Sequence, residues 1–180
     1  MLAGERKIAA DGKEVMLFPL EIMWMTQGEH NGYCMDFQGA KKNAQGNVVR
    51  ELRCPLYAPC SCTCVARSSS GDWQIFTSND VVHVPGNPLP VYVTFQIGHD
   101  NTPQSVGDTF TQGDLIGHTG TNGQVTGDHL HYNIALGHYD GWGNHQLKNS
   151  VRIFNYSYVD DTVLYDDGDY NWVEYGETPP

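Results

Sequence analysis

The sequence predicts a β-rich domain built on an antiparallel sheet, with loops that wall an open groove. Short apolar runs alternate at close spacing with turn signals rich in Gly, Pro, Asn and Ser, which is typical of antiparallel sheets. The chain has 20 Gly among 180 residues, and 11% of its residues are aromatic. This composition suits a turn-rich β protein better than a helical bundle, and helical periodicity is weak nearly everywhere.

The expected elements follow one another along the chain. Residues 1–15 are polar and mixed in charge, and we expect them to be irregular. Apolar material begins at residues 16–20, where Pro19 limits regular strand pairing. Residues 38–53 combine Gly, Lys and Asn and predict a loop or hairpin. We then expect strands or short apolar segments at residues 60–66, 73–77, 81–84, 91–97, 115–117, 129–136 and 151–154.

The length allows one domain with its own core, or one domain with a short extension. We assign residues 1–155 to this domain. Residues 156–180 mix Tyr and Trp with Asp and predict an acidic aromatic extension or the start of a linker. No apolar run is long enough to span a bilayer, and the first residues lack the apolar core of a secretory signal. We therefore expect synthesis in the cytosol without a signal peptide.

The charge balance excludes one class of partner. Ten Lys and Arg face 21 Asp and Glu, a formal net charge of −11. Non-specific binding to nucleic acid depends on cations that neutralise phosphates, so we expect no nucleic-acid partner. The same acidity disfavours docking on anionic membranes, and we expect no membrane insertion.

The cysteine pattern leaves two interpretations open. The chain has five Cys, and an odd number without a secretory signal argues against a disulfide framework. Cys60, Cys62 and Cys64 alternate with small polar residues, so one strand face would carry all three. They could form a thiolate metal site, although their spacing differs from the usual Cys-x-x-Cys. Three small buried hydrophobes are the favoured interpretation, because free Cys is among the most buried residue types.

Two histidines stand two residues apart within residues 127–134, a run that alternates like a strand. Side chains at i and i+2 of a strand share a face, so His129 and His131 project side by side. A Gly-rich turn lies shortly before them at residues 119–123. Upstream are His30 and Asp36. Imidazole and carboxylate are zinc ligands, and a zinc ion with an open position makes water nucleophilic near neutral pH.

Several segments in one order resemble the lysostaphin-type zinc endopeptidases, which cut peptide bonds in bacterial peptidoglycan. The resemblance covers about residues 18–137, and the most specific part is the run from Thr126 to His131. The segments are His30-Asn31-Gly32-Tyr33-Cys34-Met35-Asp36-Phe37, Leu56-Tyr57-Ala58-Pro59-Cys60, Gly98-His99, Gly117-His118-Thr119-Gly120 and Thr126-Gly127-Asp128-His129-Leu130-His131.

The resemblance implies a site residue by residue. His30, Asp36 and His131 would hold Zn²⁺. His129 would be the general base and His99 would stabilise the oxyanion, although these two roles could be exchanged. The sequence departs from the family where five residues, rather than three, separate His30 from Asp36, and where Asp100 follows His99.

The other histidine and aromatic residues near these segments have no assigned role in this chemistry. His118, in the turn before residues 129–136, could line the groove or be an ordinary turn residue. His138 and His145 flank a loop around Trp142 that could face substrate. Tyr33 and Tyr132 could line a groove or belong to the core, where aromatic residues of strand-rich proteins are commonly found.

The expected function is therefore that of a zinc metalloendopeptidase that hydrolyses the stem or cross-bridge peptide of peptidoglycan. The missing signal peptide and the resemblance together indicate a phage endolysin, which moves from the host cytoplasm to the bacterial cell wall. We expect this protein to be a monomer. A tail-associated lysin is the nearest competing role. The alternative function is a catalytically inactive family member that serves as a cell-wall-binding or regulatory module.

Overall fold

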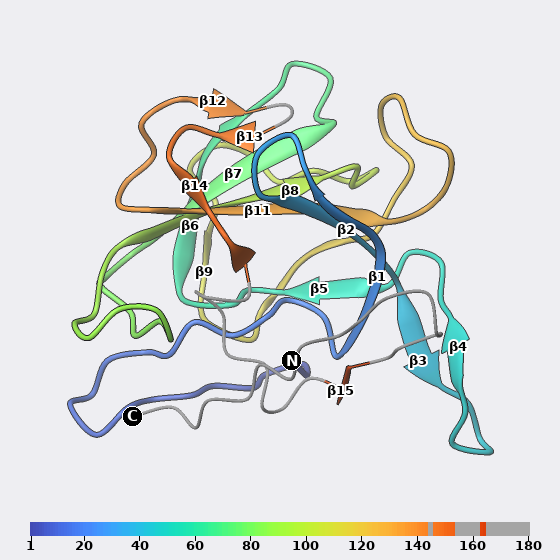
Figure 1. Ribbon diagram of the computed structural model, residues 1–180, viewed down its shortest axis with the longest axis horizontal. Helices are drawn as coiled ribbons and strands as arrows, with labels where there is room; N and C mark the ends of the chain where they lie inside the picture. Colours follow the sequence, from blue (N-terminus) through green and yellow to red (C-terminus); the bar gives the residue numbers. More distant parts are fainter. Residues whose placement is uncertain (144–145, 154–162, 165–180) are drawn as a thin grey trace.

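The structure is a computed structural model that describes residues 1–143, 146–153 and 163–164 (Figure 1). Within these residues the regular structure consists of strands and turns, without an α-helix. The prediction of a β-rich, antiparallel protein is confirmed. In the described part of the chain there is accordingly no helix able to cross a membrane.

Within the described residues, the main sheet has nine strands in the order β15-β1-β2-β11-β8-β7-β6-β9, with β14 paired to β11 beyond the end of β2. All its pairings are antiparallel except that between β1 and β15. The strands are β1 (Ile22–His30), β2 (Cys34–Gln38), β6 (Cys62–Arg67), β7 (Trp73–Ser78), β8 (Val93–Gly98), β9 (Thr109–Phe110), β11 (Leu130–Leu136), β14 (Ser150–Val151) and β15 (Val163–Leu164).

The part of the chain that the structure describes also contains three two-stranded ribbons. They pair β3 (Ala40–Lys42) with β4 (Val48–Arg50), β5 (Pro55–Tyr57) with β10 (Leu115–His118), and β12 (Trp142–Gly143) with β13 (Gln146–Leu147). The β3–β4 hairpin continues from the end of β2 and projects from the body of the protein (Figure 1). Residues 38–53 thus contain the predicted hairpin.

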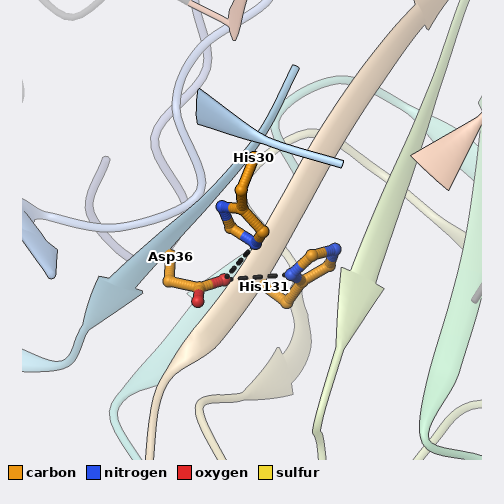
Figure 2. A group of neighbouring side chains, drawn as sticks. All are labelled: His30, Asp36 and His131. Atoms are coloured by element: carbon orange, nitrogen blue, oxygen red, sulfur yellow. Dashed lines mark hydrogen bonds and ion pairs between the residues drawn. The ribbon is translucent and has the colours of Figure 1, made fainter. Parts of the chain in front are cut away.

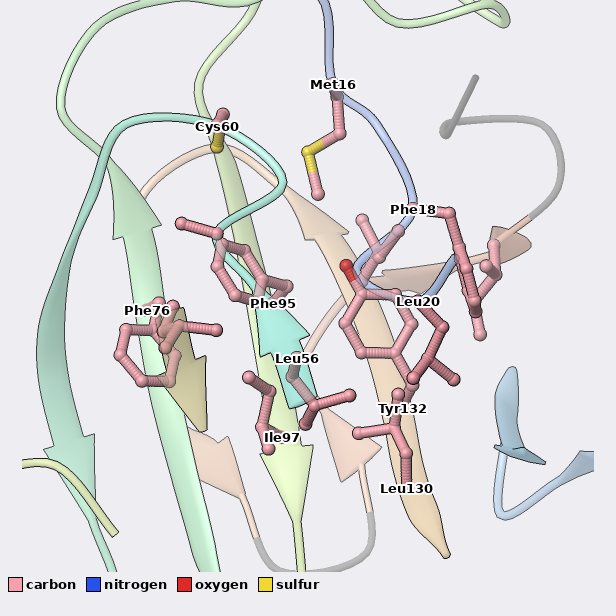
Figure 3. Packing of buried hydrophobic residues seen from close by; sticks show 14 of the residues in the cluster. Met16, Phe18, Leu20, Leu56, Cys60, Phe76, Phe95, Ile97, Leu130 and Tyr132 are labelled. Carbon is pink, nitrogen blue, oxygen red and sulfur yellow. The ribbon is translucent and has the colours of Figure 1, made fainter. Parts of the chain in front are cut away.

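The core lies against one face of the main sheet (Figure 3). Phe37, Phe95 and Tyr132 come from three adjacent strands and are fully buried. Phe18, in the irregular apolar segment before β1, packs edge-on against Phe37 with ring centroids 4.9 Å apart and against Tyr132 at 5.6 Å. Each such aromatic pair contributes about 0.5–1.5 kcal/mol beyond the area it buries. The opposite face of the central strands is therefore free to carry polar side chains.

The structure corrects several predicted boundaries. Residues 81–84 do not form a strand: Val82 makes an isolated bridge with Val91, and His83 makes one with Val15. The prolines at positions 85, 88 and 90 remove backbone donors and prevent a continuous ladder there. Strands β1 and β2 were not predicted, because their alternation is weak and β1 contains register shifts.

Two predictions concern the C-terminal part of the chain. The last expected strand, at residues 151–154, shrinks to β14, and Phe154 lies outside the described residues. The extension at 156–180 also lies outside them apart from β15.

The five cysteines are free thiols, and all are buried. Cys60, Cys62 and Cys64 belong to the main core cluster and are fully buried. Burial raises the pKa of all three thiols, to about 11 for Cys64. None of them joins a metal-capable group within the described residues. The interpretation of these residues as small buried hydrophobes is confirmed, and the thiolate metal site is not.

Candidate metal centre

The register between β2 and β11 places Asp36 opposite His131. Directly paired residues of an antiparallel ladder point to the same face, here the face away from the core. Both side chains are almost fully buried, and His131 Nδ1 lies 2.9 Å from Asp36 Oδ1 (Figure 2). The sheet therefore unites two residues that are 95 positions apart in the sequence.

His30 reaches the same point from the end of β1. The turn of the β1–β2 hairpin includes Asn31 and Gly32, both with positive φ, and the ladder shifts register before His30. His30 Nε2 lies 3.6 Å from Asp36 Oδ1, while its Nδ1 is 2.8 Å from the Gly28 carbonyl (Figure 2). The five residues between His30 and Asp36 thus form the hairpin turn and the start of β2. His30 and Asp36 therefore lie on adjacent strands.

These three side chains fit a zinc ion. Their ligand atoms all lie within 4.8 Å of one another. In a tetrahedral site with bonds of about 2.0–2.1 Å, ligand atoms would be about 3.3 Å apart, close to the distances of 2.9 and 3.6 Å found here. A backbone carbonyl can only accept, so His30 Nδ1 carries the proton and its Nε2 offers a lone pair. Two imidazoles and one carboxylate are the three-ligand pattern of catalytic zinc.

Two further histidines stand beside this group. His129 immediately precedes β11 and bridges to Gly120 of the Gly-rich turn. Its Nδ1 is 2.8 Å from the Gly127 carbonyl, and its Nε2 is 3.6 Å from Asp36 Oδ2. His99 follows β8, and its Nδ1 is 2.9 Å from the Asn122 carbonyl. The carbonyls again require a proton on Nδ1, so in the neutral ring each Nε2 is a free acceptor.

The backbone around His99 depends on close contacts. His99 has a φ of +70°, a left-handed conformation that is costly for a residue with a side chain. Its amide donates to the Asp72 carbonyl at 2.7 Å, and its own carbonyl accepts from the Asn122 amide at 3.0 Å. Gly98 pairs with His131, and a Cβ at Gly98 would lie only 2.9 Å from His131 Cβ. A glycine before His99 is thus required for the two histidines to approach.

Electrostatics distinguish the histidines. Burial alone would lower the pKa of His131, but its hydrogen bonds to Asp36 and Cys34 outweigh burial and raise that pKa to about 10. Burial would raise the pKa of Asp36, but the hydrogen bond from His131 and the nearby imidazoles lower it. For His99, burial dominates and lowers the pKa. His99 is therefore neutral at pH 7, whereas His131 holds a proton in the place a metal ion would take.

The group lies on an open groove formed by two adjoining cavities of about 590 and 300 Å³. Asp36, His129, Gln27 and Thr126 line both of them. The larger cavity also contains His30, Asn31, Asp72, Trp73, Gly98, His99, Gln124, Val125 and His131. This volume is typical of a ligand site. All five residues predicted for the site thus line one groove.

The remaining predicted rings lie elsewhere. His118 lines neither cavity, the His138 ring lies tilted against Tyr92 with ring centroids 4.1 Å apart, and Tyr132 belongs to the core. Tyr33 is partly exposed beneath the Arg152 guanidinium rather than in the groove. His145 and the side chain of Trp142 lie outside the described residues.

The sequence reasoning missed Cys34, which hydrogen-bonds His131, and the charged groove residues Asp72 and Arg50. Cys34 stands inside the recognised segment, but only the hairpin geometry shows that its thiol meets the imidazole. Asp72 and Arg50 belong to a turn and a hairpin whose position relative to the site no local pattern indicates.

No protein-family model matches the chain. The chain is similar to Morphogenesis protein 1 of Bacillus phage B103, with 35% identity over 139 residues. The match covers 73% of this chain and 35% of the relative, so the chain spans about a third of the relative's length.

Solved structures show a weaker likeness. A zinc-containing peptidase from Vibrio cholerae matches at a TM-score of 0.44 and 16% identity, over 73% of this chain and 43% of that one. The catalytic domain of lysostaphin from Staphylococcus simulans matches at 0.43 and 21%, over 75% and 84%. A prophage-encoded M23 protein from Enterococcus faecalis matches at 0.42 and 18%, over 72% and 88%. Scores below 0.5 assign neither a fold family nor an activity to this chain.

Proposed function

We propose that this chain is a zinc-dependent endopeptidase that hydrolyses peptide bonds of bacterial peptidoglycan. The observation that carries the proposal is the convergence of His30, Asp36 and His131 in an open groove, beside two histidines that are not needed as ligands. A purely structural zinc site would be closed by a fourth protein ligand. The substrate class comes from the sequence resemblance to lysostaphin-type enzymes at residues 30–37, 56–60 and 126–131.

The residues present can divide the work of amide hydrolysis. His30 Nε2, Asp36 and His131 Nδ1 would hold zinc, which when bound supplies Lewis acidity. In the reaction, water adds to the carbonyl carbon, the C–N bond breaks, and the leaving amine gains the proton that water loses. A neutral His99 with a free Nε2 is suited to accept that proton and return it to the amine.

His129 is suited to the complementary role. The Nδ1 proton of His129 is donated to the Gly127 carbonyl. His129 can therefore donate from Nε2 only when both ring nitrogens carry a proton. Its Nε2 lies 3.6 Å from Asp36 Oδ2, at the edge of the proposed metal site. A protonated His129 can then stabilise the negative charge that develops on the carbonyl oxygen, a contribution of about 3–4 kcal/mol in other enzymes. This assignment exchanges the roles first expected for the two histidines.

Digestion of purified peptidoglycans with different cross-bridges tests the proposal. We expect about one zinc per chain, fragments with new amino and carboxyl ends in mass spectrometry, and loss of both zinc and cleavage in His131→Ala. New reducing sugar ends without new amino groups would contradict a peptidase. A folded, zinc-free protein that still binds cell wall would instead support the inactive binding module.

The biological setting is a separate proposal. We propose that the chain acts on the host cell wall as part of a phage particle rather than as a free endolysin. The 35% identical relative is named for phage morphogenesis, which favours the particle-associated role. Mass spectrometry of purified virions should detect the chain in stoichiometric amount. Its presence only in the soluble lysate would favour the endolysin instead.

A further inference from the structure

The smaller cavity carries a charge that the proposed mechanism does not use. It continues the groove past the residues shared with the larger cavity, so a peptide lying across Asp36 and His129 would extend into it. Its permanently charged lining residues are Asp36, Asp128 and Arg50. Arg50 comes from β4, the outer strand of the β3–β4 hairpin, and is exposed.

The Asp128 carboxylate is turned into the protein and is already occupied. Its Oδ1 accepts from the Thr119 hydroxyl at 2.5 Å, and its Oδ2 accepts from the Arg53 amide at 3.2 Å. Only 7% of Asp128 is exposed. Asp36 belongs to the candidate metal centre. Arg50 is therefore the permanent charge in this cavity that is available to a ligand.

Most other cations of this acidic chain are neutralised by carboxylates. Within the described residues, none of the ion pairs includes Arg50, whereas Lys41 on the same hairpin pairs with Glu51 at 2.8 Å. Further Lys and Arg ion pairs among the described residues include Arg6–Glu14, Lys13–Asp80, Arg53–Asp100, Lys148–Asp140 and Arg152–Glu29. Lys42 and Arg67 also lie outside these pairs, but neither lines the groove. A guanidinium without a carboxylate partner in the groove of a chain with net charge −11 favours an anionic ligand.

The guanidinium is also oriented. One of its Nη2 hydrogens is donated to the Asp128 carbonyl at 3.2 Å, next to His129. A guanidinium has five N–H donors, so the others remain for a planar acceptor. Its fork matches the two oxygens of a carboxylate. The larger cavity instead offers a negative charge, because the Asp72 carboxylate lines it. This carboxylate accepts a hydrogen bond from the Ser70 hydroxyl at 2.7 Å.

We propose that Arg50 binds a free carboxylate of the peptide substrate close to the scissile bond. Arg50 would thereby select a carboxylate over a carboxamide at that position of the peptide. This inference rests on the proposed function, because it needs a peptide that lies along the groove.

A pair of matched substrates tests this inference. A soluble peptidoglycan peptide, whose cleaved bond is first located by mass spectrometry, is compared with versions in which each free carboxylate near that bond is converted singly to a carboxamide. For one of these positions the wild-type chain should favour the carboxylate form about tenfold in kcat/KM, mainly through KM. Arg50→Gln should erase this preference, because it should lose more kcat/KM on the carboxylate form than on the carboxamide form.

Lys42→Gln is the matched control, because it removes the same charge from the same hairpin at an exposed residue outside the cavity. This variant should keep the preference. The wild-type preference should also shrink as salt is added, since screening weakens an exposed pair. Zinc content and melting temperature should show that Arg50→Gln is folded and loaded.

Three results would overturn the inference while leaving the proposed function intact. They are equal cleavage of every form by the wild-type chain, an equal loss on both forms in Arg50→Gln, and the same loss of preference in Lys42→Gln. The second result would mean that Arg50 only braces the backbone at Asp128. If no form were cleaved, the proposed function would fail. In that case, isothermal calorimetry with the same peptides would test the inference. If the wild-type chain and Arg50→Gln bound the carboxylate peptide with equal affinity, the inference would be overturned.

Discussion

The two faces of strand β11 carry opposite chemistry within seven residues. Leu130, Tyr132 and Ile134 point into the core and are fully buried among aromatic and aliphatic side chains. On the other face, His131 opens onto the groove. Further along that face, Asn133 is covered by β13, whose Leu147 amide donates to Asn133 Oδ1 at 2.7 Å.

The two faces of β11 place different requirements on their residues. A core position depends on volume and apolar area, so it tolerates changes that preserve shape. A position such as His131 depends on single atoms: Nδ1 must meet Asp36, and the ring must also reach Cys34. The core face therefore stabilises the scaffold, and the other face holds a group of atoms whose loss affects function more than folding. The following predictions test this division from the largest expected effect to the smallest.

The largest effect should come from His131→Ala. Without this ligand the site keeps only His30 and Asp36, and we expect zinc to be lost and kcat/KM for peptidoglycan peptides to fall by at least about 10³-fold. Circular dichroism should still show a β-rich fold. Elemental analysis that finds one zinc per chain in this variant would remove His131 from the ligand set.

His99→Ala and His129→Ala should separate catalysis from metal binding. Each should retain about one zinc per chain and lose about 10²–10⁴-fold in kcat. Because burial lowers the pKa of His99, wild-type activity should rise with pH through a value below 6.5. This acidic limb should vanish in His99→Ala. Its persistence there would return the role of base to His129.

Cys34→Ala should weaken zinc binding about tenfold, because the His131 ring loses a hydrogen bond that orients it. Competition with a chromophoric chelator measures this affinity. Cys64→Ala is the matched control: Cys64 is a buried core thiol that does not line the groove. It should lower the melting temperature without changing zinc affinity, and equal zinc affinity in both variants would contradict the positioning role of Cys34.

The metal-free protein should lose stability as pH rises. The folded-state pKa of His131, about 10, lies above its ordinary value of 6.5. Its contribution is therefore fully present below pH 6.5 and is lost as pH rises towards 10. The lowered pKa of Asp36 means that its contribution is present above pH 3.8 and is lost as pH falls below that value.

Melting temperatures measured in chelator at several pH values test this window, in which the pair stabilises the fold most between about pH 4 and 6.5. His131→Ala should flatten the alkaline limb. Zinc affinity should rise with pH over the same range, because zinc must displace the proton on His131. An alkaline limb that is unchanged in His131→Ala would assign it to other groups.

The smallest effect should come from the core face. The Tyr132 hydroxyl is buried without a hydrogen-bond partner among the described residues. Tyr132→Phe removes this unpaired group and keeps the ring, so the free energy of unfolding should change by less than about 0.5 kcal/mol or increase. Zinc content and activity should be unchanged. A loss above about 2 kcal/mol in chemical denaturation would mean that the hydroxyl has a partner.

Local pattern was sufficient for part of the fold and part of the site. The alternation at residues 129–136 predicts a strand, and the structure places both His129 and His131 on the groove. The alternating cysteines predict burial, which the core confirms. The hairpin within 38–53 follows from its Gly and Asn content. Strands β1 and β2 were missed because their ladder is irregular and their pattern is weak.

The sequence alone determined the chemical types at the centre: two imidazoles two residues apart, a third histidine and a carboxylate upstream, and a Gly-rich turn between. These follow from side-chain identity and from the period of a strand. Only the tertiary structure decided that Asp36 faces His131, that Cys34 meets the same ring, and that Arg50 enters the groove. Those contacts depend on ladder register and hairpin placement, which are set by the packing of the whole sheet rather than by neighbouring residues.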